Sequence, residues 1–312
     1  MNGALTRQRR GFFRHASDVL FRHPHLLLLL LLVPPLLWLG IVYVGSLLTL
    51  LLNSFFSIDE FSGLIRYEFT LATYAELFRL ANLDVIFRSL IMATAVSLTS
   101  VAIAFPIAYF AARYARGKWK ALFYLLVMLP LWSSYLVKIY AWKLILAKEG
   151  IISWLAGQLH LTRLLDAVLA IPVVGGPSLS ISYIGTFLVF VYVWLPYMIL
   201  PTQAALERVP GNLIEAAADL GASPRQALRT VILPLALPGI IAGSIFTFSL
   251  TLGDYIVPQI VGTSTYFLGQ AVYTLQGTAG NIPLAAAFTV VPIVIMGVYL
   301  WVAKRMGAFH AL

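Results

Sequence analysis

Long apolar segments recur along the 312-residue chain and restrict its fold more than any other feature. A helix needs about 20 apolar residues to cross the hydrocarbon core of a bilayer. Only 11% of the residues are charged, whereas soluble domains have about 25%. We therefore expect an all-α polytopic membrane protein with about six transmembrane helices. The expected spans are 26–52, 86–112, 121–147, 183–206, 239–257 and 284–303, and Pro130 is expected to interrupt the third.

The first apolar segment follows an arginine-rich stretch, an arrangement that is also typical of a cleaved signal peptide. However, Pro34 and Pro35 stand where a small-residue cleavage site would be, and apolar character continues to Leu52. We interpret 1–25 as a basic tail that precedes an uncleaved span.

Basic residues are concentrated in alternate connecting segments. They occur in 1–25, in the turn after the second span, in 207–238 and in the tail 304–312. Because cytoplasmic loops carry an excess of Lys and Arg, both termini and 207–238 are expected in the cytoplasm. Residues 26–303 are expected to form the transmembrane domain, and the protein is expected in the cytoplasmic (inner) membrane. The net charge of +9 does not indicate nucleic-acid binding, because the basic residues form no aromatic-interleaved patch.

The residue types present argue against catalysis and metal binding. The chain has no cysteine, and its five histidines lack the H-E-x-x-H spacing or a comparable one. It also lacks the nucleotide-binding sequence G-x-x-x-x-G-K-[ST] and a convincing set of nucleophile, base and orienting group. We therefore predict no enzyme activity, no metal and no cofactor bound by this chain.

Between the fourth and fifth spans, the polar segment 207–238 has the signals of two short helices. Asn212 can cap the first helix, and Glu215, three residues later, can complete a capping box. Gly221 is placed to end this helix in the left-handed conformation. Leucines and alanines spaced three and four residues apart give the helix one apolar face, which is typical of a docking surface. The face consists of Leu213, Ala217 and Leu220.

The second helix has its own start and stop signals. Ser223 is its expected cap, with Pro224 at the first helical position and Gln226 as the partner in a capping box. Pro234 and Pro238 are expected to end it. Its apolar face consists of Leu228, Val231 and Leu235.

The order Glu215-Ala216-Ala217, Gly221 and Ile232-Leu233-Pro234 resembles the cytoplasmic EAA loop of permease subunits of binding-protein-dependent ABC importers. The resemblance implies the type I importer permease architecture and a coupling helix that inserts into a cleft of an ATPase subunit. An alternative role for Glu215 is simply to cap its own helix. The residues implied in ATPase coupling are Glu215, Ala216, Ala217, Asp219, Leu220, Gly221 and Ser223.

Two further runs are similar to spermidine/putrescine-type permeases: S-L-T-L-G-D-Y-I-V-P-Q-I-V-G at 249–262, and L-P-L-W-S-S-Y-L-V-K-I-Y-A-W at 129–142. The resemblance implies half of a pathway for a small polar, cationic solute such as a polyamine. It also implies a second homologous permease, two ATPase subunits that hold ATP and Mg, and an extracytoplasmic solute-binding protein.

Asp254 is the only acidic residue inside an expected span. A charge there is costly unless it faces a partner, a polar cavity or water, so it is a candidate for the solute pathway. The alternative is an interfacial residue near the outer end of the span. Lys138 and Lys143 are the natural counter-charges, and at most one of them can face Asp254 because they lie five residues apart on a helix.

Two roles are open for the aromatic residues near these charges. Tyr and Trp concentrate at membrane interfaces, but they also form cages for ammonium groups. The candidate pathway residues are Asp254, Tyr255, Trp132, Tyr135, Tyr140 and Lys138.

The connecting segments carry three further expectations. The stretch 148–182 is expected to be irregular with short interfacial helices, and 258–283 to be a glycine-rich polar loop. Gly239 and Gly243 form a G-x-x-x-G pair, which lets another helix approach closely.

Two functions of other classes remain open from the sequence. A secondary transporter or channel working alone would show inverted repeats or several intramembrane charges, and neither is clear here. A non-transporting membrane assembly protein would use 207–238 only for docking.

Overall fold

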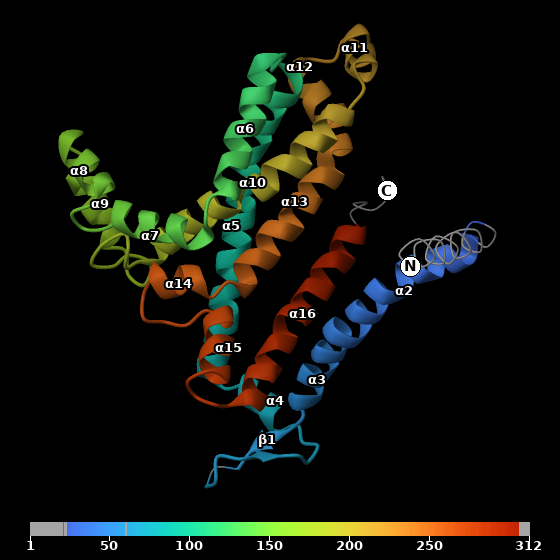
Figure 1. Cartoon of the computed structure of the whole chain (residues 1–312). Helices are drawn as coiled ribbons and strands as arrows, with labels where there is room; N and C mark the ends of the chain where they lie inside the picture. Colours follow the sequence, from blue (N-terminus) through green and yellow to red (C-terminus); the bar gives the residue numbers. More distant parts are fainter. Residues whose placement is uncertain (1–20, 22–23, 60, 306–312) are drawn as a thin grey trace, which may run out of the picture.

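The computed structural model describes residues 21, 24–59 and 61–305. Most of these residues are helical, and one small hairpin lies at one end of the molecule (Figure 1). The expected basic tail 1–25 and the tail 304–312 lie largely outside the described residues. The α-helices are α2 (Pro24–Trp38), α3 (Gly45–Asn53), α4 (Ala72–Leu77), α5 (Leu80–Arg113), α6 (Lys118–Trp132), α7 (Tyr135–Ile145), α8 (Ile151–Gln158), α9 (Thr162–Leu169), α10 (Tyr183–Arg208), α11 (Gly211–Asp219), α12 (Pro224–Ala227), α13 (Leu233–Gly253), α14 (Ile256–Ile260), α15 (Leu268–Gln276) and α16 (Ile282–Arg305). The π-helical segments are η1 (Leu39–Val44) and η2 (Leu228–Ile232), and the strands are β1 (Ser57–Ile58) and β2 (Ile65–Arg66).

Five helical segments among the described residues are long and apolar enough to cross a membrane. The pair α6 and α7 makes a sixth span if the bent pair is counted as one. The five segments are Leu27–Asn53, Leu80–Arg113, Tyr183–Arg208, Pro224–Gly253 and Ile282–Arg305.

The helices α5, α10 and α13 pack against one another and form the centre of the bundle (Figure 1). Gly239 and Gly243 make the contact between α13 and α10 close. A Cβ atom at Gly239 would lie 2.3 Å from the Cβ of Ala205, and one at Gly243 would lie 2.8 Å from the Sδ of Met198. The close approach expected from the G-x-x-x-G pair is therefore present, and the neighbouring helix belongs to the same chain.

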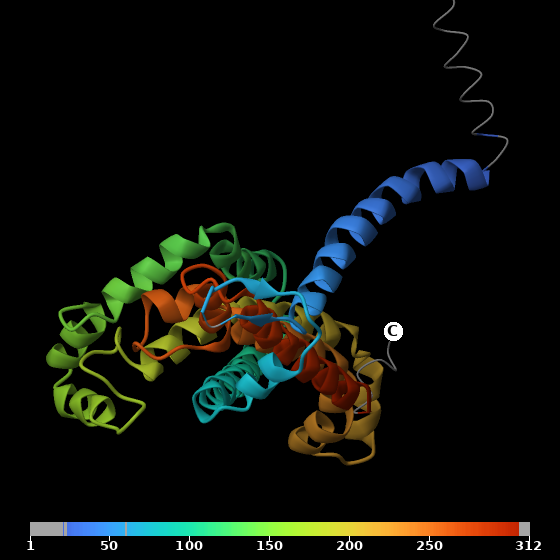
Figure 2. The ribbon, with the colours of Figure 1, turned by 90° about the horizontal axis from the view of Figure 1, so that it is seen from below.

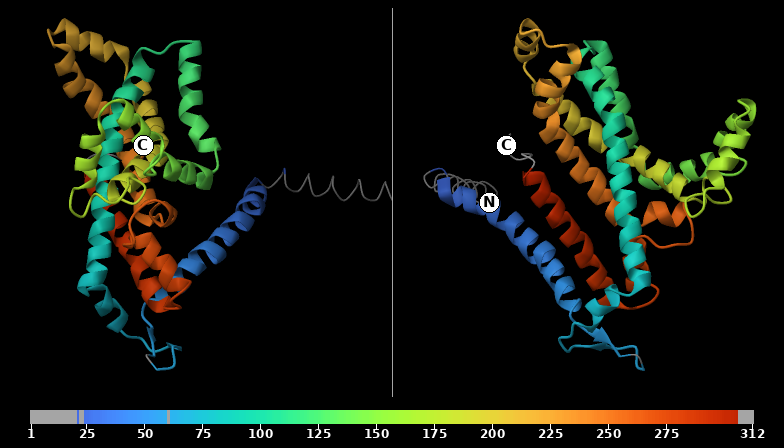
Figure 3. Two further views of the ribbon diagram at one scale, coloured as in Figure 1. Left: turned by 90° about the vertical axis from the view of Figure 1, so that its left-hand side faces the viewer. Right: turned by 180° about the vertical axis from the view of Figure 1, so that it is seen from behind.

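The first span leans away from the rest of the bundle (Figures 2 and 3). None of the residues in its most apolar window is buried. Within the described part of the chain, α3 contacts α16 near the hairpin end. The π-helical segment η1 begins at Leu39, four residues after Pro35.

The third expected span is broken, and the break is not where the sequence indicated. The expectation of an interruption at Pro130 was wrong, because α6 continues through that residue to Trp132. Ser133 and Ser134 instead take extended backbone conformations, with ψ of 150° and 132°. As a result, α7 leaves α6 at an angle of 94°.

The second helix of 207–238 does not end at the prolines. α12, η2 and α13 form one continuous helical segment from Pro224 to Gly253. Pro234 lies in the first turn of α13, directly after the π-helical turn, where its missing N–H and fixed φ fit. Pro238 is accommodated inside the helix. The expectation that these residues close the helix was therefore wrong.

The connecting segments contain more regular structure than expected. α8 and α9 lie in 148–182, as predicted, but 258–283 is not simply a loop, because it contains most of α14 and all of α15. Leu268 and Ala271 of α15 pack on Ala287 and Phe288 of α16. The second span begins at Leu80, six residues earlier than expected.

Candidate functional site

The turn between α11 and α12 has the geometry that the sequence predicted for Gly221. Its φ is +80°, in the left-handed region where glycine is favoured. The N–H of Ala222 donates to the carbonyl of Ala217 at 2.9 Å, and the N–H of Gly221 donates to that of Ala218 at 2.8 Å. This pair of hydrogen bonds closes α11 and reverses the chain sharply.

The predicted cap of the first loop helix is not formed. Pro210, not Asn212, is the N-cap of α11, and no side chain accepts a hydrogen bond there. Because the helix begins at Gly211, Asn212 already lies within its first turn. Glu215 is exposed and makes no capping contact with Asn212. Its carboxylate therefore remains available to another molecule.

The predicted cap of the second helix is confirmed. The N–H of Gln226 donates to the Oγ of Ser223 at 3.4 Å, and the N–H of Ser223 donates to the Oε1 of Gln226 at 2.8 Å. Pro224 occupies the first helical position. These contacts fix the start of the long helical segment that continues to Gly253.

The apolar residues of the loop divide between two surroundings. Ile214 packs against Leu206 of α10 and Ile232, on the inner side of the loop. In contrast, Leu213 is 43% exposed and Leu220 is 89% exposed, at the projecting end of the molecule (Figure 1). Leu220 is thus an isolated exposed leucine directly before Gly221.

Leu228 and Val231 are half-buried, and Leu235 is exposed. The fully covered residues of this helix are Ala227, Ile232 and Ala236. The five-residue turn η2 changes the register of the buried face, which is the reason that simple helical spacing did not predict it.

Three polar contacts hold the end of α10, from which the loop starts. The Nη2 of Arg113 donates to the carbonyl oxygen of Val209 at 3.0 Å, directly before α11. The Oε1 of Glu207 lies 2.9 Å from the Nζ of Lys120 and accepts a hydrogen bond from the hydroxyl of Tyr124 at 3.0 Å. The ends of α5 and α6 thus position the loop.

Asp254 lies at the far end of the same helical segment. It directly follows Gly253, the last residue of α13. The expectation that it lies inside a span was therefore wrong. Its Oδ1 accepts hydrogen bonds from the backbone N–H groups of Ile256 and Val257 at 2.7 and 3.0 Å. Its Oδ2 accepts a hydrogen bond from the hydroxyl of Tyr135, at the start of α7. The carboxylate therefore joins α13, α14 and α7.

Aromatic rings surround this carboxylate. The ring of Tyr135 stacks on that of Trp194, with centroids 5.8 Å apart, and the ring of Tyr255 stacks on that of Tyr273, with centroids 4.6 Å apart. A cavity of about 320 Å³ opens beside them. Its lining includes Trp194, Asp254 and Tyr255, so two of the predicted pathway residues share one cavity.

Apart from Tyr135, which bonds to Asp254, the other predicted pathway residues lie elsewhere. Trp132 is 75% exposed and Tyr140 is 54% exposed, and neither lines the cavity. The Nζ of Lys138 donates to the carbonyl oxygen of Pro130 at 2.7 Å, at the end of α6. Lys143 is exposed and also makes no ion pair with Asp254. The expectation of a lysine counter-charge for Asp254 was therefore wrong, because Lys138 satisfies a free helix-end carbonyl.

Sequence reasoning missed four residues of these sites. Arg113 and Lys120 were interpreted only as part of the basic turn after the second span, and Glu207 only as the start of the polar segment 207–238. An acid and a base at the same end of neighbouring spans are a usable signal of such contacts. Trp194 gave no signal beyond that of any apolar residue in a span.

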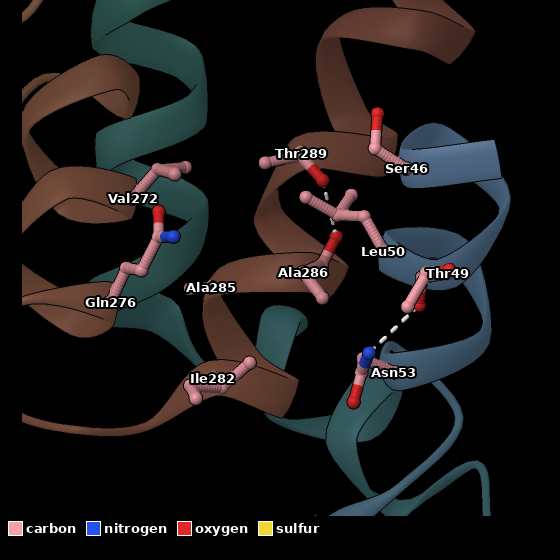
Figure 4. A pocket seen from close by; sticks show the side chains of 10 residues that line it. All are labelled: Ser46, Thr49, Leu50, Asn53, Val272, Gln276, Ile282, Ala285, Ala286 and Thr289. Atoms are coloured by element: carbon pink, nitrogen blue, oxygen red, sulfur yellow. Dashed lines mark hydrogen bonds between the residues drawn. The ribbon is translucent and has the colours of Figure 1, made fainter. Parts of the chain in front are cut away.

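A further cavity of about 390 Å³ lies between α3, α15 and α16. Figure 4 shows its uncharged polar side chains, among them Thr49, Asn53, Gln276 and Thr289. The Nδ2 of Asn53 donates to the carbonyl oxygen of Thr49 at 2.8 Å, within the same helix. None of the predicted pathway residues lines this cavity.

Comparisons with known proteins agree on one kind of protein. Residues 104–308 match the model of the binding-protein-dependent transport system inner membrane component family. The inner membrane ABC transporter permease protein YdcU of Escherichia coli (strain K12) is 57% identical over 302 residues, which cover 97% of this chain and 94% of that protein. The spermidine/putrescine transport system permease protein PotB of Haemophilus influenzae is 30% identical, over 85% of this chain and 88% of that protein.

Solved structures show the same fold. A chain of the bacterial alginate ABC transporter, in complex with a periplasmic protein bound to an alginate pentasaccharide, aligns with a TM-score of 0.69 at 15% identity, over 93% of this chain and 96% of that one. A chain of the inward-facing MetNI methionine ABC transporter aligns with a TM-score of 0.53 at 17% identity, over 74% of this chain and 96% of that one. The expected polytopic all-α fold is confirmed.

Proposed function

The chain belongs to the family of binding-protein-dependent transport system inner membrane components and is a permease subunit of an ABC importer, and we propose that 207–238 couples it to an ATPase. It is a multi-pass protein of the inner membrane with the type I importer permease fold. The alternatives of a transporter working alone and of an assembly protein are thereby set aside.

The continuous helix from Pro224 to Gly253 carries the proposal for coupling. At one end, the capping box at Ser223 fixes this helix to the exposed turn that contains Leu220 and Gly221. At the other end, Asp254 connects it to α14 and to Tyr135. Movement of the loop with a closing ATPase would therefore be transmitted along this continuous helix to the cavity beside Asp254.

The energy comes from other subunits in this proposal. The sequence lacks G-x-x-x-x-G-K-[ST], so ATP and Mg would be held by two ATPase subunits, and this chain would have no catalytic activity of its own. A second homologous permease would form the other half of the pathway. An extracytoplasmic solute-binding protein would deliver the solute.

The proposed solute is small, polar and cationic, such as a polyamine. The relatives named as spermidine/putrescine permeases support this class, as do the aromatic rings of Tyr135, Trp194 and Tyr255 near the carboxylate of Asp254. Because the carboxylate already accepts three hydrogen bonds within the chain, its role in the pathway is to hold these rings in place. An ammonium group would then be bound by the aromatic faces.

Substitution of Gly221 by Asp tests the coupling role. Gly63 provides a matched control, because both glycines have positive φ, +80° and +68°, and open space around the Cβ position. Each Asp variant therefore carries similar backbone strain, about 1–2 kcal/mol. Only Gly221→Asp adds a carboxylate to the docking turn, where desolvation would cost about 1–3 kcal/mol, or roughly five- to 150-fold in docking affinity.

The measurement is solute uptake and ATP hydrolysis by the assembled transporter in vesicles. We expect Gly221→Asp to lower uptake and the binding of the ATPase, whereas Gly63→Asp retains both. Normal uptake by Gly221→Asp would exclude the proposed coupling role.

A further inference from the structure

A groove of about 480 Å³ lies between the end of α5 and the start of α6. It is separate from the cavity beside Asp254 and from the turn at Gly221. Phe110, Leu122, Phe123 and Leu126 supply its apolar lining. Several of these side chains are open to the surroundings, since Phe110 is 61% exposed and Leu126 is 58% exposed.

The lining changes character along the helix axis. Leu126 lies eight residues beyond Lys118, the first residue of α6, which corresponds to about 12 Å along the helix. Near the helix ends, the groove is lined instead by Tyr114, Arg116 and Trp119. The groove is therefore apolar towards the middle of the bilayer and aromatic and basic at the boundary, where Trp and Tyr favour the headgroup region.

Two of the four basic residues around this turn are used within the chain. Arg113 donates to the carbonyl oxygen of Val209, and Lys120 pairs with Glu207. Arg116 and Lys118 are exposed and form no ion pair with any acidic residue in the part of the chain that the structure describes. Arg116 therefore brings an unpaired positive charge to the polar end of the groove, and the exposed Lys118, two residues later at the start of α6, adds a second charge nearby.

We propose that this groove binds an anionic phospholipid of the cytoplasmic leaflet. The phosphodiester pairs with Arg116 and Lys118, the ring of Trp119 lies at the level of the glycerol, and an acyl chain fills the groove along Leu122 and Leu126. Basic pockets between helices on the cytoplasmic side are suited to such headgroups. An apolar helix of another protein would fit the same lining but would leave both cations unpaired, which favours the lipid.

Trp119 provides a local probe for the test. The assembled transporter is reconstituted in phosphatidylcholine vesicles that contain a minor fraction of brominated phosphatidylglycerol or, separately, brominated phosphatidylcholine. The fluorescence quenched at Trp119 is the difference between the unaltered protein and Trp119→Phe, because the chain has seven tryptophans. We expect stronger quenching by the anionic lipid, with the preference falling about fivefold for each basic residue that is removed.

The double variant Arg116→Gln with Lys118→Gln should lose the preference for the anionic lipid. Arg116→Lys should retain this preference, which would show that the fold tolerates a change at this position. The matched control is Lys304→Gln with Arg305→Gln, which removes two charges from the end of α16. Equal quenching by both lipids would overturn the proposal, as would an equal loss in the control pair, which would indicate a general surface charge. Shielding of Trp119 from both lipids would also overturn it, because a protein segment would then cover the groove.

Discussion

The hydrogen bond between Tyr135 and Asp254 allows a sharp test of what the carboxylate does. It connects residues 119 positions apart in the sequence and joins α7 to the end of α13. Tyr135→Phe removes the hydroxyl and keeps the stacking of the ring on Trp194. Asp254 retains the two backbone N–H groups of α14 as donors. The variant therefore isolates one hydrogen bond to a charged acceptor.

Such a hydrogen bond contributes about 1.5–3 kcal/mol. We expect Tyr135→Phe to lower the free energy of unfolding by this amount. Asp254→Ala should cost about 0.5–2 kcal/mol more, because it also removes the cap of α14. A double-mutant cycle should then give a coupling energy of about 1.5–3 kcal/mol between the two side chains.

The assay is unfolding of the purified chain in mixed micelles, followed by tryptophan fluorescence, together with uptake by the assembled transporter over a range of solute concentrations. Tyr255→Phe is the control for the unfolding measurement, because its hydroxyl makes no hydrogen bond with the described residues, and its ring stacks on Tyr273. A coupling energy below about 0.5 kcal/mol would refute the reasoning. An increase in KM for the solute at unchanged stability would instead identify Asp254 as a direct solute ligand.

Two further predictions concern packing and the anchor of the loop. Gly239→Ala should destabilise the chain by about 1–3 kcal/mol, because the new Cβ would lie 2.3 Å from that of Ala205. Gly297→Ala has open space around the new Cβ and should be neutral or stabilising in the same unfolding assay. Glu207→Gln should weaken the contact with α6 and lower the uptake obtained per ATP hydrolysed. The control Glu149→Gln, at an exposed position, should change neither. An unchanged ratio of uptake to ATP hydrolysis in Glu207→Gln would exclude a role for this anchor in coupling.

Much of the candidate coupling site could be predicted from the sequence because its geometry depends on neighbours along the chain. The left-handed conformation of Gly221 and the capping box of Ser223 involve residues no more than five positions apart. The cap expected at Asn212 failed for a local reason too, since the helix begins at Gly211, two residues earlier than a cap at Asn212 requires. Local signals give the kind of turn reliably and its boundary less so.

The sequence by itself determined that the chain spans a membrane about six times and carries a helix–glycine–helix loop on its basic side, because apolar length and short-range capping are properties of consecutive residues. The tertiary structure decided the rest. The helix continues past Pro234 and Pro238, and a partner 119 residues away determines what Asp254 contacts. Such contacts depend on which helices become neighbours, and a single sequence does not contain that information in any local pattern.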